Sequence, residues 1–123
     1  MLTLQTLLDE RAIREALACF ARILDEKRWD ALDNVFAADL NFDYGDGERR
    51  GMDALRAQVR RYLDACGHTQ HLIGSISVDV DGELAVSRSY VQARHQGLGD
   101  KANLFFDSNG EYIDPNTLAA GSR

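Results

Sequence analysis

The sequence predicts an α+β domain in which helices occupy the first half of the chain and antiparallel strands the second. Apolar residues recur about every four positions as far as Gly67 and alternate with polar residues after it, so the period changes from helix to strand. A turn signal at residues 81–83 separates two alternating segments and predicts a hairpin. A chain of 123 residues fits one domain, here residues 1–123, with a disordered tail expected from about residue 115.

The first half contains three predicted helices and one strand. The longest helix is expected from Thr3 to about Leu24, with an apolar stripe of Leu4, Leu7, Leu8, Ile13, Leu17, Phe20 and Leu24. Thr6 and Asp9 resemble a capping box, which allows a break near Thr6. Shorter helices are expected over residues 29–36 and about 52–65, the latter capped by Gly67. Between them, Leu40, Phe42 and Tyr44 alternate with polar residues as in a strand.

The register of the predicted hairpin decides whether His71 and His95 share a face. A two-residue turn, Asp81-Gly82, would place His71 opposite Gln92 and send the two histidines to opposite faces. A three-residue loop would pair Val80 with Leu84, Val78 with Val86, Ser77 with Ser87, Ser75 with Ser89, Ile73 with Val91 and His71 with Ala93. The second register pairs like with like, so we favour it and expect both imidazoles on one face. The tail is expected to form two short strands, the second ended by Pro115.

Composition and charge exclude several classes of function. Apolar residues make up 45% of the chain and charged residues 28%, as in soluble globular proteins. A net charge of −6 argues against nucleic-acid binding, which depends on clustered Lys and Arg. No leader pattern or long apolar run is present, and Cys19 and Cys66, expected as buried free thiols, lack metal or disulfide spacing. We therefore expect a cytoplasmic protein that does not bind membranes.

Metal and cofactor sites are also not expected. His68 and His71 would point to opposite faces of a strand, with His68 in solvent, so they cannot bind one metal together. The glycines of "DYGDGE" and "HQGLGD" lack the following helix that a phosphate-binding loop needs. Two cysteines are too few for an iron–sulfur centre.

Four segments, "LDEKRWDAL", "NFDYG", "TQHLIGS" and "ARHQG", resemble in order and spacing the scytalone dehydratase-like branch of the SnoaL/NTF2-like superfamily, as far as about Gly97. The resemblance implies a cone-shaped NTF2-like fold, with three helices packed on a curved antiparallel sheet around an apolar pocket. The family's last strand has no counterpart in this sequence, so the sheet could lack it. Family members are usually dimers or trimers, which implies a homo-oligomer.

The resemblance also implies roles for individual residues. Asp25 would pair with His95, His71 would move protons on the substrate, and Tyr44 would hold a water against a substrate carbonyl. Leu24 stands where the family has a second pocket tyrosine, and Asn103 is a candidate for its pocket asparagine. An imidazole suits such a role because its ordinary pKa is about 6.5, close to neutral pH.

The resemblance and the shared histidine face together predict a cofactor-independent acid/base enzyme. It would be a dehydratase or other lyase, or a related isomerase or cyclase, acting on a small hydrophobic ring or polyketide-like substrate through an Asp–His pair. The alternative is a non-catalytic ligand-binding protein or partner subunit, resembling the small subunit of ring-hydroxylating oxygenases.

Overall fold

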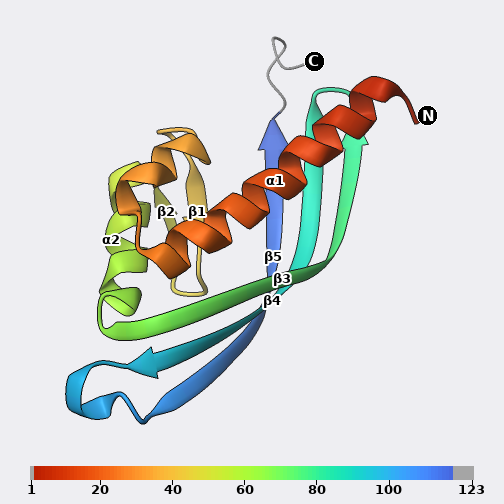
Figure 1. Cartoon of the computed structure of the whole chain (residues 1–123). Helices are drawn as coiled ribbons and strands as arrows, with labels where there is room; N and C mark the ends of the chain where they lie inside the picture. The colour runs from red at the N-terminus through yellow and green to blue at the C-terminus, as the bar shows by residue number, and fades with distance from the viewer. Residues whose placement is uncertain (1, 118–123) are drawn as a thin grey trace.

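The structure, a computed structural model, describes residues 2–117 and consists of a long helix laid across a bent three-stranded sheet, with a smaller layer beside it (Figure 1). The elements follow in the order α1 (Leu4–Glu26), η1 (Trp29–Asn34), β1 (Asn41–Asp43), β2 (Glu48–Arg50), α2 (Met52–Leu63), β3 (Cys66–Asp81), β4 (Leu84–Gly97), η2 (Gly99–Lys101) and β5 (Phe105–Thr117). The α+β prediction is confirmed. The strands form two antiparallel sheets, β1-β2 and β3-β4-β5, with β4 in the middle of the larger sheet.

Helix α1 is continuous from its first turn. The Thr3 hydroxyl accepts a hydrogen bond from the Thr6 backbone N–H, and the Thr6 hydroxyl accepts one from the Thr3 N–H, so the capping box begins at Thr3. The expected break near Thr6 is therefore wrong. At the other end Lys27 adopts a left-handed conformation, with φ of 53°, and its ammonium donates to the Cys66 carbonyl. This hydrogen bond fixes the end of α1 against the start of β3.

The hydrophobic core lies at the C-terminal end of α1, where η1 and α2 pack against it. Its buried members are Phe20, Ile23, Leu24, Trp29, Leu32, Met52, Leu55, Val59 and Leu63. Leu4, Leu7 and Leu8 are exposed, so the prediction that they continue the core stripe is wrong. The reason is position, because the first turns of α1 lie beside Val78 and Val80, near the hairpin tip, away from the core (Figure 1).

The hairpin of β3 and β4 has a register that neither simple turn predicts. Next to the turn Asp81 pairs with Leu84 and Val80 with Ala85, so the expected pairings of Val80 with Leu84, Val78 with Val86 and Ser77 with Ser87 are wrong. A β-bulge between Gly74 and Ser77 adds one residue to β3, and its residue Ser75 has a φ of +47°.

The bulge restores the predicted register at the other end of the hairpin. Beyond it, Ile73 pairs with Val91 and His71 with Ala93, as expected. The bulge also coincides with the bend of the sheet (Figure 1), as expected of an inserted residue that increases the local twist.

Strand β5 is longer than the sequence predicted. It runs without interruption from Phe105 to Thr117 and includes Pro115, which pairs with Val86. Proline is tolerated because β5 is at the edge of the sheet, where no further strand needs its missing N–H among the described residues. The two short strands expected here are therefore one. No strand follows β5 within residues 2–117, and the rest of the expected tail lies outside the described residues.

The two cysteines have different environments. Cys66 is buried, whereas Cys19 is exposed, so the expectation of two buried thiols is wrong for Cys19, which lies on the solvent side of α1. In the described part of the chain, no helix is both long and apolar enough to span a bilayer.

Candidate active site

The end of α1 places the Asp25 carboxylate against the first part of β3. Its Oδ1 lies 2.6 Å from His71 Nδ1 and accepts a 2.9 Å hydrogen bond from the Thr69 hydroxyl, while Oδ2 accepts a 3.0 Å bond from the His71 backbone N–H. A carboxylate can only accept hydrogen bonds, so His71 Nδ1 carries a hydrogen, and in the neutral imidazole the lone pair is on Nε2. The His71 side chain is 8% exposed and that of Asp25 is 19% exposed. The arrangement fixes the orientation and the tautomer of one largely buried imidazole.

His95 lies beside this pair, on β4. The centroids of the His71 and His95 rings are 5.8 Å apart and the rings are nearly perpendicular, so the prediction that they share a face agrees with the geometry. The other side of His95 stacks on Phe106 of β5 at a centroid distance of 4.2 Å. Burial lowers the pKa of His95 and the neighbouring His71 lowers it further, while the Phe106 backbone and the charges of Asp107 and Asp25 partly offset this. His95 is therefore neutral at neutral pH.

The observed partner of Asp25 differs from the one that the resemblance implied. Asp25 contacts His71, whereas the expected pairing was with His95. The cause is the placement of α1, which packs on β3 and so brings its last turn to Thr69 and His71 before it can reach β4. His95 has the Phe106 ring in place of a carboxylate.

Tyr44 follows β1 and belongs to a second group of polar side chains. Its ring contacts Phe42 at a centroid distance of 5.9 Å, and the residue is 46% exposed. Burial, with the charges of Tyr112 and Asp114, raises the pKa of Tyr44 above the ordinary tyrosine value. Tyr44 therefore lies within reach of the charges on β5, while part of its side chain faces solvent.

Tyr112 and Asp114, both on β5, are the polar residues of this region that the sequence did not single out. Tyr112 contacts Phe20 of α1 at 6.1 Å between ring centroids. Burial, then the charges of Asp114 and Asp25, raises the pKa of Tyr112 to about 12, and burial raises that of Asp114. The alternation of residues in "NGEYID" places Tyr112 and Asp114 on one face of a strand. Which face that is follows only from the register that pairs Tyr112 with Ser89 and Phe106 with His95.

The remaining residues considered from the sequence lie apart from these groups. Leu24 is buried in the hydrophobic core, and His68 is exposed on the outer face of β3, as expected. Asn103 is exposed in the turn before β5. Among residues 2–117, no three histidine, cysteine or acidic side chains are grouped closely enough to hold a metal ion.

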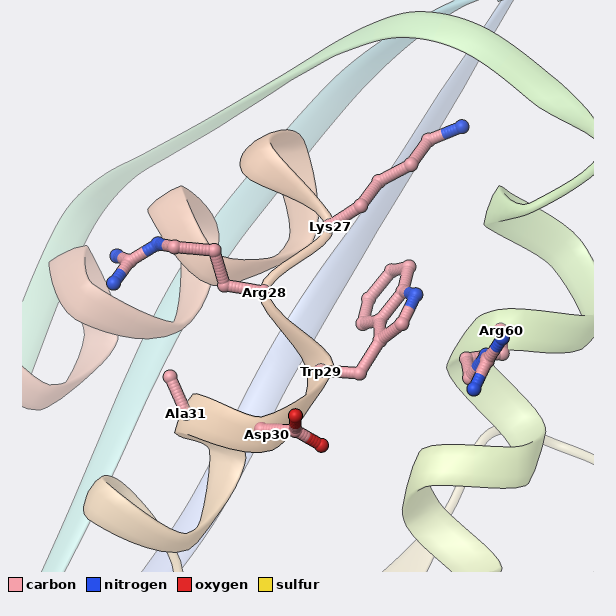
Figure 2. Close-up of a pocket in the computed structure, with 6 residues that line it drawn as sticks. All are labelled: Lys27, Arg28, Trp29, Asp30, Ala31 and Arg60. Carbon is pink, nitrogen blue, oxygen red and sulfur yellow. The ribbon is translucent and has the colours of Figure 1, made fainter.

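A surface hollow of about 400 Å³ lies outside the junction of α1 and η1 (Figure 2). It is lined by Lys27, Arg28, Trp29, Asp30, Ala31 and Arg60. Three of its polar side chains have partners in the framework: Lys27 donates to the Cys66 carbonyl, and the Trp29 indole N–H and Arg60 both donate to Asp64. The hollow therefore belongs to the framework that holds the end of α1 in place.

Comparison with known proteins places the chain in a family. The family model described as "SnoaL-like domain" matches residues 5–121. The uncharacterized protein Rv2910c of Mycobacterium tuberculosis is 29% identical over 110 residues, which cover 86% of this chain and 74% of that protein.

Two solved structures have the same fold. The Kfla4162 protein of Kribbella flavida superposes with a TM-score of 0.82 at 22% identity, covering 91% of this chain and 82% of that one. A protein of Novosphingobium aromaticivorans, provisionally assigned as a scytalone dehydratase, superposes with a TM-score of 0.81 at 24% identity. The match covers 95% of this chain and 78% of that one. At these identities the likeness shows the fold alone.

Proposed function

Because the chain belongs to the SnoaL-like domain family, we propose that it is a cofactor-independent acid/base enzyme that eliminates water from, or isomerises or cyclises, a small hydrophobic ring substrate. The observation that carries the proposal is the 2.6 Å contact between Asp25 and His71. A carboxylate that orients an imidazole and stabilises its protonated form is the usual support of a histidine general base. Asp25 has three hydrogen-bond contacts with Thr69 and His71 of one strand. This distinguishes it from a solvated acidic residue at the end of a helix.

In the proposed dehydration, His71 Nε2 removes a proton from the carbon next to a substrate carbonyl. The electrons of the broken C–H bond form the new double bond as hydroxide leaves the next carbon. The protonated His71 returns its proton to the hydroxide, so that one water is released and the enzyme is regenerated. Asp25 stabilises the transient imidazolium between these two transfers.

His95 and Tyr44 act on the oxygen atoms of the substrate. The lowered pKa of His95 leaves it neutral, which favours a hydrogen-bonding role at the leaving hydroxyl over the donation of a proton as an imidazolium. Tyr44 stays protonated and polarises the carbonyl through a water molecule, as the family resemblance implies. The Phe106 ring, stacked on His95, gives this place an apolar side, which suits an apolar ring system.

Turnover of a bicyclic β-hydroxy ketone tests this function. 3-Hydroxy-1-tetralone loses one water to give, after tautomerisation, 1-naphthol, whose fluorescence reports the rate. We expect Asp25→Asn and His71→Gln each to lower kcat on the order of a hundredfold or more, because both groups take part in proton transfer. His68→Gln is the matched control, since His68 lies on the outer face of the same strand, and it should retain wild-type activity.

Two results would contradict the proposal. If Asp25→Asn and His71→Gln fold and retain the wild-type rate, Asp25 and His71 do not take part in the reaction. A wild-type protein that binds β-hydroxy ketones of one and two rings without turning any over would favour the non-catalytic alternative, a ligand-binding protein or partner subunit. The expected homo-oligomer remains a separate prediction, which sedimentation of the purified chain would test.

A further inference from the structure

Within residues 2–117, the Asp25 carboxylate has hydrogen-bond contacts with two residues, His71 and Thr69. The two contacts with His71 are made by its ring Nδ1, at 2.6 Å, and by its backbone N–H, at 3.0 Å. The third is the 2.9 Å hydrogen bond that the Thr69 hydroxyl donates to Oδ1, the oxygen that also meets the ring. Thr69 therefore holds the carboxylate independently of His71.

A local irregularity at the start of β3 turns the Thr69 side chain inwards. Cys66 pairs with Gly97 and Thr69 with His95, so β3 has one residue more than β4 over this stretch. The register at Cys66, continued without the extra residue, would pair Thr69 with Arg94, which is exposed on the outer face. Inserted residues often re-aim a side chain beside an active site. Here the insertion brings the Thr69 hydroxyl to the end of α1.

This hydroxyl restrains a torsion of Asp25 that the backbone of α1 leaves soft. The χ2 torsion of an aspartate is broad, so the position of its Cα does not fix the plane of its carboxylate. A threonine side chain is stiff because it is β-branched, which fixes its Oγ1 relative to the strand. The Thr69 hydroxyl therefore sets the plane in which the carboxylate meets His71 Nδ1.

We propose that Thr69 is a positioning residue, whose hydroxyl holds the Asp25 carboxylate in the orientation that keeps the hydrogen of His71 on Nδ1. The resulting tautomer leaves the lone pair of the neutral imidazole on Nε2. The inference rests on the proposed function only for the use of that lone pair as a base. A threonine with a purely structural role would affect stability and leave the tautomer unchanged.

NMR of the imidazole nitrogens tests this role without a substrate. At about pH 9, well above the ordinary histidine pKa of about 6.5, the nitrogen chemical shifts distinguish the ring nitrogen that carries the hydrogen from the one with the lone pair. We expect the Nδ1–H form of His71 in the wild type. In Thr69→Val the two nitrogen shifts of His71 should move towards each other, because the ring then exchanges between tautomers. Thr69→Ser keeps the hydroxyl and should restore most of the wild-type difference.

Two controls separate this effect from a packing defect at position 69. Thr69 is the cross-strand neighbour of His95, so a disturbed strand would also displace the His95 ring from Phe106. The ring-proton shifts of His95 should therefore stay close to their wild-type values in Thr69→Val. Gln70→Val places a valine on the exposed outer face of the same strand and should leave both histidines unchanged.

Turnover of the β-hydroxy ketone tests the consequence for the reaction. We expect Thr69→Val to lower kcat about tenfold, the value of one hydrogen bond to a charged group, and to leave KM nearly unchanged, because Thr69 acts through Asp25 and not on the substrate. Thr69→Ser should recover most of the rate.

Two results would overturn the inference. One is a folded Thr69→Val in which His71 stays fully in the Nδ1–H form, and the other is a Thr69→Ser that does not restore a tautomer lost in Thr69→Val. If Thr69→Val does not fold, Thr69→Ala serves for the same comparison. Failure of the proposed function gives a different result. An inactive wild-type protein whose His71 tautomer still depended on Thr69 would reject the enzyme and retain Thr69 as the residue that orients Asp25.

Discussion

At the residue scale, the two inward-facing histidines differ because their neighbours differ. His71 has a carboxylate at 2.6 Å, whereas His95 has the flat face of Phe106. A carboxylate stabilises an imidazolium, and burial against an apolar ring destabilises it. Two identical side chains on adjacent strands are thus suited to different tasks, one to proton transfer and the other to a neutral hydrogen bond.

The lowered pKa of His95 can be measured directly. We expect its imidazole resonance to titrate below the ordinary histidine value of about 6.5. Since the unfolded chain then binds the proton more readily than the folded one, the stability contribution is present above about pH 6.5 and is lost as the pH falls towards the folded pKa.

NMR titration of the three histidines, with His95→Gln to identify the signal, gives the midpoint. Thermal unfolding between about pH 7.5 and 5.5 should show a smaller loss of Tm in His95→Gln than in the wild type. A His95 midpoint above 6.5 would be incompatible with the apolar environment of this ring.

The sequence could supply the residues of the site but not all of their contacts. Asp25, His71, His95 and Tyr44 could be singled out because residue type and spacing are visible in one dimension. The partner of Asp25 depends on which strand α1 covers, and the position of Tyr112 depends on the register of β5 against β4. Both are long-range properties that no local pattern encodes.

At the element scale, the bulge in β3 determines which face carries His71. The register beside the turn, continued without a bulge, would pair His71 with Arg94 in place of Ala93 and turn its side chain outwards. Arg14 of α1 donates to the carbonyl of Ile76 within the bulge, so the helix also holds this irregularity. The bulge could not be predicted from the sequence, because the residue of the bulge with positive φ is Ser75, whereas glycine is the usual residue at such a position.

The effect of a substitution at Ser75 on stability should therefore depend on how well the new residue tolerates positive φ. A β-branched side chain is strongly disfavoured at positive φ, so we expect Ser75→Val to lower the free energy of unfolding by about 1–2 kcal/mol. Ser75→Gly should be neutral or slightly stabilising, because relief of strain is offset by the flexibility of glycine in the unfolded chain.

Ser77→Val is the matched control, since Ser77 is an exposed strand residue just beyond the bulge and should tolerate valine. Urea denaturation of the three variants measures the differences. Equal effects of valine at positions 75 and 77 would mean that the bulge is absent in solution.

At the scale of the whole molecule, packing is concentrated at one end. The core joins the C-terminal half of α1 to η1 and α2, which also anchors Asp25. The opposite end, where α1 begins beside the hairpin tip, has exposed leucines on the helix (Figure 1). The fold class could be predicted from the sequence because periodicity is a local property. The apolar stripe of α1, however, is longer than the core, so its first leucines are left exposed.

Two leucine substitutions in α1 test this gradient. Leu24 is 3% exposed in the core, so Leu24→Ala should lower the free energy of unfolding by about 2–5 kcal/mol. Leu8 is 50% exposed, and Leu8→Ala should cost no more than about 0.5 kcal/mol, because little apolar area is lost and alanine favours the helix. Urea denaturation at several protein concentrations measures both. A large loss for Leu8→Ala that grows with protein concentration would show that a second copy of the chain covers this end of the helix in solution.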